Sequence, residues 1–96
     1  MTGANVVVEN VIPHKLRTAI RFLDDAAERE SSYFVELAED EIKEILDYLA
    51  MTNPYHDFIP VGMKIVGSFE ESFEKGTSEP LNVAYSTMKR YLEENK

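Results

Sequence analysis

The side chains in this 96-residue chain that most resemble acid–base machinery are Tyr55, His56 and Asp57. An aspartate beside a histidine can orient the imidazole ring and stabilise its protonated form. These residues follow Pro54, however, in a break between two helical patterns, where such side chains more commonly cap a helix or contact water. No serine or threonine is marked by its spacing as a nucleophile for His56 or His14. We therefore interpret the cluster as structural, and we predict no catalytic residues and no enzymatic activity.

Motifs that hold metals or cofactors are missing as well. The sequence contains no cysteine, no His-Glu-x-x-His pair and no phosphate-binding glycine loop, and its acidic stretch lacks the glycine and spacing of an EF-hand. Asp24, Asp25 and Glu28 could share a hard cation, but such a run is more commonly a solvated helix face. We expect neither a metal nor a cofactor.

Charge is the strongest signal in the sequence. Residues 24–47 hold ten acidic and two basic side chains, which is −8, the net charge of the whole chain. Residues 1–23 are weakly basic, and residues 48–96 are nearly balanced. A field of this sign attracts basic partners and repels the phosphate backbone of nucleic acids. The acidic row from Glu36 to Asp47 is either an ordinary solvated helix face or a docking surface for a basic protein.

The candidate partner-binding residues lie on this stretch and just after it. Carboxylates at helical spacing would steer a basic partner, and tyrosines near them would serve as amphipathic anchors. The predicted set is Glu36, Glu39, Asp40, Glu44, Asp47, Tyr48 and Tyr55.

Apolar residues at helical spacing predict the elements that must position these side chains. The expected helices cover residues 13–29, 31–52, 58–75 and 79–94. Glu39 and Lys43 are expected to pair at i,i+4 on the second of them. Short loops between helices favour an antiparallel packing. The sequence therefore predicts a mainly α protein, a small antiparallel bundle of about four helices.

Three segments also carry strand-like patterns. Residues 5–12 are rich in valine and predict a short strand or an extended arm. Residues 33–37 and 59–66 alternate in a way that a strand would also allow. We therefore divide the chain into an N-terminal arm or strand, residues 1–12, and a single helical domain, residues 13–96. A real strand would need a partner from residues 33–37, from residues 61–65 or from a second copy, so a homodimer is possible.

No apolar run approaches the roughly 18 residues of a membrane span, and the first residues lack the basic region of a signal peptide. We expect no membrane association and a cytoplasmic location.

Residues 6–38 resemble a ribbon-helix-helix DNA-binding unit. The valine run corresponds to its strand, residues 13–29 to its first helix, and Ser31-Ser32 to the start of its second helix. The resemblance implies a dimer whose paired strands read the major groove. The two possible groove-facing sets are not basic: Val6, Val8 and Asn10, or Val7, Glu9 and Val11. Antitoxins of this family often carry an acidic toxin-binding part.

In size, charge and helix number the chain is also similar to the small acidic helical immunity proteins that block nuclease toxins. The paired tyrosines that those proteins present on their third helix have no counterpart at residues 57–60. We predict a non-enzymatic interaction module, a small regulator, inhibitor or adaptor that presents an acidic helical face to a basic partner. The alternative is a dimeric, antitoxin-type regulator that binds DNA.

Overall fold

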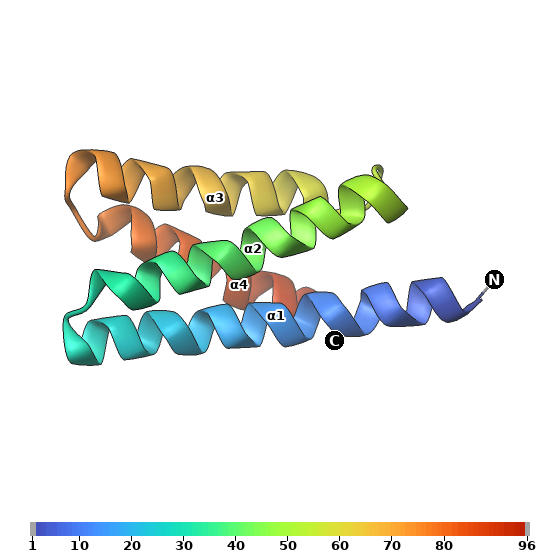
Figure 1. Cartoon of the computed structure of the whole chain (residues 1–96), viewed down its shortest axis with the longest axis horizontal. Helices are drawn as coiled ribbons and strands as arrows, with labels where there is room; N and C mark the ends of the chain where they lie inside the picture. Colours follow the sequence, from blue (N-terminus) through green and yellow to red (C-terminus); the bar gives the residue numbers. More distant parts are fainter. Residues whose placement is uncertain (1, 96) are drawn as a thin grey trace.

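The structure is a computed structural model that describes the backbone of residues 2–95 and the side chains of residues 10–95. It contains the four helices α1 (Thr2–Arg29), α2 (Ser32–Thr52), α3 (Phe58–Lys75) and α4 (Glu79–Glu94). Successive helices run in opposite directions and form an elongated bundle of 44 × 22 × 21 Å (Figure 1). The predicted helical bundle is confirmed, and α2, α3 and α4 begin and end within one residue of the predicted bounds.

Each helix contributes one apolar stripe to a shared core. Along α2, for example, Val35, Ala38, Ile42, Ile45 and Leu49 recur every three or four residues and are all buried. Burying one large aliphatic or aromatic side chain of this kind contributes about 1.5–3 kcal/mol. The largest fully buried side chains come from all four helices: Leu16, Ile42, Ile45, Leu49, Phe58, Ile65, Phe69 and Met88.

The structure does not contain the strand that was predicted at residues 5–12. Thr2 to Ile12 belong to α1, and the helix continues through Pro13 to Arg29 without a break; Met1 lies outside the described residues. A strand is stable only when it is paired, and the two candidate partners within the chain, residues 33–37 and 61–65, are themselves helical. The valine run therefore has no strand beside it and extends the helix that follows. The boundary drawn between residues 12 and 13 falls inside α1.

α1 ends at a tight turn that leads into α2. Glu30 adopts a left-handed backbone conformation with φ of 52°, and the Ser31 N–H donates to the Ala26 carbonyl over 3.2 Å. This pattern is the Schellman C-cap, in which glycine usually occupies the left-handed position. The chain then reverses directly into α2.

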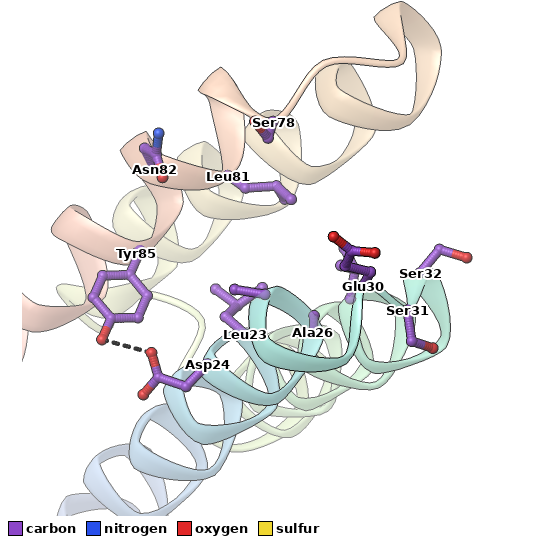
Figure 2. Close-up of a pocket in the computed structure, with 12 residues that line it drawn as sticks. Leu23, Asp24, Ala26, Glu30, Ser31, Ser32, Ser78, Leu81, Asn82 and Tyr85 are labelled. Carbon is purple, nitrogen blue, oxygen red and sulfur yellow. Dashed lines mark hydrogen bonds between the residues drawn. The ribbon is translucent and has the colours of Figure 1, made fainter.

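α1 and α4 have the loosest contact among the helix pairs that touch. A side-chain hydrogen bond crosses this seam: the Tyr85 hydroxyl donates to Asp24 Oδ1 over 2.9 Å (Figure 2). The helices leave an open pocket beside this bond.

α2 and α3 approach closely at Gly62. A Cβ atom at this position would lie 2.7 Å from both Leu46 Cδ2 and Phe58 Cε2, and Phe58 is fully buried. A Cβ atom at Gly67, on the same helix, would meet nothing within 4 Å.

These two glycines make a matched pair. We predict that Gly62→Ala lowers the free energy of unfolding by about 1–3 kcal/mol because the methyl group overpacks the α2–α3 contact. Gly67→Ala is expected to raise it by about 1 kcal/mol, the helix propensity of alanine over glycine. Urea unfolding followed by circular dichroism measures both values. Equal effects of the two substitutions would contradict the close approach at Gly62.

Candidate functional site

The exposed side of α2 carries a row of carboxylates. Glu36, Asp40, Glu44 and Asp47 follow one another at spacings of four, four and three residues, so they lie on one face of the helix, and all four are exposed. We call these four residues the acidic stripe. Among residues 10–95, an ion pair reaches Glu44 but not the other three. The apolar stripe of α2 faces the opposite way, and its burial therefore fixes the outward direction of the carboxylates.

A shallow hollow of about 530 Å³ lies beside the acidic stripe, between α1 and α2. Phe22 and Leu37 supply apolar surface to it, and Lys43 is the one basic residue in its lining. Its other lining residues are four carboxylates: Asp40, Glu41, Glu44 and Asp47. The hollow offers a cationic side chain both negative charge and apolar surface for an aliphatic stem.

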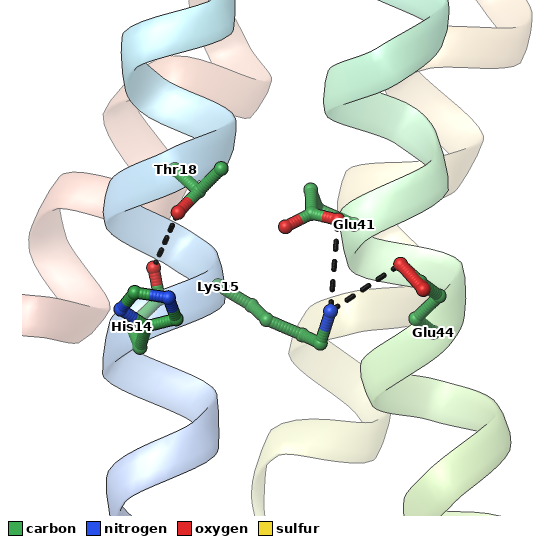
Figure 3. Close-up of polar contacts among 5 residues, drawn as sticks. All are labelled: His14, Lys15, Thr18, Glu41 and Glu44. Atoms are coloured by element: carbon green, nitrogen blue, oxygen red, sulfur yellow. Dashed lines mark hydrogen bonds and ion pairs between the residues drawn. The ribbon is translucent and has the colours of Figure 1, made fainter.

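Lys15 of α1 partly neutralises one edge of this hollow. Its Nζ lies 3.3 Å from Glu44 Oε2 and 3.6 Å from Glu41 Oε2 (Figure 3). Burial raises the pKa of the Glu41 carboxyl, a hydrogen bond with Glu44 adds to the rise, and Lys15 opposes it. One lysine serves two carboxylates, so the hollow keeps an excess of negative charge. Lys15, Glu41 and Phe22 could not be predicted from the sequence, because their proximity depends on how α1 packs against α2.

Glu39, one of the predicted partner-binding residues, does not belong to the acidic stripe. The residue is buried, with 8% of its surface exposed, and its pKa is raised first by that burial. Lys43 lies 3.6 Å away and opposes the rise, which confirms the expected i,i+4 pair, whereas Glu70 of α3 adds to it. Glu39 lies close enough to α3 for the charge of Glu70 to act on its carboxyl group. Glu39 therefore does not lie on the open face of α2, where the sequence predicted it.

The two predicted tyrosine anchors differ in exposure. Tyr48 is half-buried and packs against the core, so only part of its ring is open to a partner. Tyr55 lies in the loop after α2 and is 93% exposed. Both follow Asp47 closely in the chain, at the C-terminal end of the acidic stripe.

In the cluster at Tyr55, His56 and Asp57, His56 caps α3. The Phe58 N–H donates to His56 Nδ1 over 3.0 Å, and the Ile59 N–H donates to the His56 carbonyl over 3.1 Å. His56 thus satisfies N–H groups that the first turn of a helix leaves without partners. Its ring nitrogen is occupied by the backbone, in agreement with the structural interpretation of the cluster.

In the part of the chain that the structure describes, no group of three or more histidine, cysteine, aspartate or glutamate side chains is arranged to hold a metal ion. Within the same residues, no helix combines the length and the apolar character needed to cross a membrane. Comparison of the chain with protein-family models, curated proteins and solved structures gave no match.

The burial of Glu39 predicts a pH dependence of stability. Because its folded pKa lies above its unfolded pKa of about 4.3, the folded state binds the proton more tightly. The ionised carboxylate therefore costs stability at neutral pH, and this cost disappears as the pH falls through the folded pKa. We predict that Glu39→Gln is more stable than the parent at pH 7 and that the difference shrinks towards pH 4.

Urea unfolding at both pH values measures this difference, with Glu36→Gln as the matched control on the exposed face. If the stability advantage of Glu39→Gln over the parent grows as the pH falls, burial does not raise the pKa of Glu39.

Proposed function

We propose that this protein is a non-enzymatic interaction module, a small regulator, inhibitor or adaptor, that presents the acidic stripe of α2 to a basic protein. The observation that carries the proposal is the hollow beside the stripe, which four carboxylates and one lysine line. Glu36, Asp40 and Asp47 form the open part of the surface, and Glu44 shares Lys15 with Glu41. Glu39, being buried, is left out of the proposed surface.

Electrostatics of this kind act mainly on the rate of encounter. Exposed carboxylates on one face attract a basic partner over about a Debye length, roughly 8–10 Å at physiological salt, and orient it before contact. Phe22 and Leu37 offer apolar surface beside the carboxylates, and Tyr55 offers a highly exposed aromatic ring at the end of the row. Aromatic anchors of this kind commonly supply much of the short-range affinity.

The ribbon-helix-helix alternative receives no support from the fold. It needs residues 6–12 as a strand that pairs with a second copy, and the backbone of these residues belongs to α1. The oligomeric state stays a prediction.

The test is a comparison of two charge-reversed proteins. One carries Glu36→Lys, Asp40→Lys and Asp47→Lys on the acidic stripe. A basic partner recovered with the parent protein is purified and titrated against the parent and this variant at 0.05 and 0.5 M salt. We expect the stripe variant to bind about ten- to a hundredfold more weakly at low salt, mainly through slower association, and the difference to narrow at high salt.

The control variant carries Glu74→Lys, Glu93→Lys and Glu94→Lys, which change the net charge equally at exposed positions of α3 and α4. It separates recognition by the stripe from attraction by net charge. If both variants lose the same affinity, or neither loses any, the proposed docking surface is wrong.

A further inference from the structure

The seam between α1 and α4 opens into a second cavity, away from the acidic stripe. This pocket of about 520 Å³ lies between the C-terminal part of α1, the turn that leads to α2, and the first half of α4 (Figure 2). Its apolar surface comes from three helices, and includes Leu23 and Ala26 of α1, Val35 of α2 and Leu81 of α4. Leu23, Ala26 and Val35 are core residues, so the pocket reaches the edge of the hydrophobic core.

Every charged side chain that lines the pocket is acidic. These residues are Asp24 and Glu30, and the other polar lining residues are neutral serines, Asn82 and Tyr85. Asp24 accepts the hydrogen bond from the Tyr85 hydroxyl, whereas Glu30 takes part in no ion pair among residues 10–95. The C-terminal end of the α1 macrodipole adds negative potential at the same place. The N-terminal end of α4 brings the opposite sign, and Glu79 in its first turn offsets it.

Two basic side chains near the pocket lie over aromatic rings. The Arg29 guanidinium lies 5.6 Å from the centre of the Phe34 ring, and Lys89 Nζ lies 5.0 Å from the centre of the Tyr85 ring. Neither residue lines the pocket. Lys89 nevertheless weakens the negative potential near Asp24, because Asp24 is bonded to the same tyrosine. Of the two carboxylates, Glu30 is therefore the one that neither an ion pair nor a tyrosine hydroxyl engages among residues 10–95.

Glu30 stands at the mouth of the pocket. Its side chain points into the gap between α1 and α4, on the side of Ser78 and Leu81 (Figure 2). Its left-handed backbone, with φ of 52°, is strained for a non-glycine residue. Glycine at this position would relieve the strain and remove the carboxylate, which gives an experimental way to separate binding from stability.

The length of the pocket limits the size of the molecule that can bind in it. The Asp24–Tyr85 hydrogen bond bounds one end, and the turn at Ser31 and Ser32 bounds the other. From Asp24 to Glu30 a helix rises about 9 Å, since each residue adds 1.5 Å. A docked helix of twelve residues would need about 18 Å. A volume of about 520 Å³ is instead within the range of sites for small molecules.

We propose that the α1–α4 pocket binds a small amphiphilic cation, an apolar body that carries one ammonium or guanidinium group. The apolar body packs on Leu23, Val35 and Leu81. The cationic group pairs with Glu30, and Asp24 contributes more weakly. This site is separate from the acidic stripe and does not depend on its role.

Three probes of matched size test the chemistry: 2-phenylethylammonium, the neutral 2-phenylethanol and the anionic 3-phenylpropionate. Each is titrated into the ¹⁵N-labelled full chain at pH 7, and backbone amide shifts are followed by NMR. We expect saturable shifts at the lining residues, with the cation binding about fivefold more tightly than the alcohol and at least about tenfold more tightly than the anion.

Variants locate the charge that is responsible. Glu30→Gln and Glu30→Gly are each expected to weaken binding of the cation about fivefold, the second while raising thermal stability, and Asp24→Asn to weaken it less. Glu36→Gln on the acidic stripe is the matched control and leaves binding unchanged. Ala27→Phe, at an exposed position in the pocket lining, is expected to block all three probes.

The proposal is overturned by equal affinity for the three probes, by equal effects of Glu30→Gln and Glu36→Gln, or by shifts that gather on the acidic stripe rather than at the pocket. A failure of the acidic stripe to bind a basic protein would leave the pocket unaffected, because the substitutions that test the pocket, at Glu30, Asp24 and Ala27, lie outside the stripe.

Discussion

The rest of this structure depends on one constraint, which is the orientation of α2 about its own axis. Val35, Ala38, Ile42, Ile45 and Leu49 are buried together against the other helices. Once they are buried, every other side chain of the helix has a fixed direction. Rotating the helix by one residue would expose much of this apolar row and bury carboxylates, at a cost of several kcal/mol. The acidic stripe is thus a consequence of core packing.

The same packing sorts neighbouring carboxylates into different roles. Glu36 and Asp40 are open to solvent, Glu41 pairs with Lys15 of α1, and Glu39 is buried close to α3. Adjacent positions on a helix point about 100° apart, so a run of acids in the sequence cannot form one surface. The acidic face of the protein is therefore narrower than the composition of residues 24–47 suggests.

The sequence was sufficient for the parts of the fold that depend on local pattern. Helical spacing of apolar residues predicted the four helices, and Asn53-Pro54 and Gly76 marked ends of helices that the structure contains. The predicted strand at residues 5–12 was wrong because β-branched residues favour a strand only where another strand is available. Pro13 also fitted the first turn of a helix, whereas it lies in the interior of α1.

The site was less predictable than the fold. The direction of Glu36, Asp40 and Asp47 followed from periodicity alone. The burial of Glu39 depends on its distance from α3, and the hollow at Phe22 and Leu37 depends on how α1 lies on α2. The α1–α4 pocket brings together residues about 50 positions apart, and no local pattern in either segment signals it. Contacts of this kind are determined by the packing of whole helices.

The orientation of α2 can be measured directly, because the chain has no cysteine of its own. Single cysteines are introduced at positions 36, 39, 40 and 47, and the rate of thiol labelling is followed under native conditions. The account predicts fast labelling at Glu36→Cys, Asp40→Cys and Asp47→Cys, and labelling at least about tenfold slower at Glu39→Cys, where it requires local opening. Equal rates at all four positions, or protection at position 40 with free access at position 39, would contradict it.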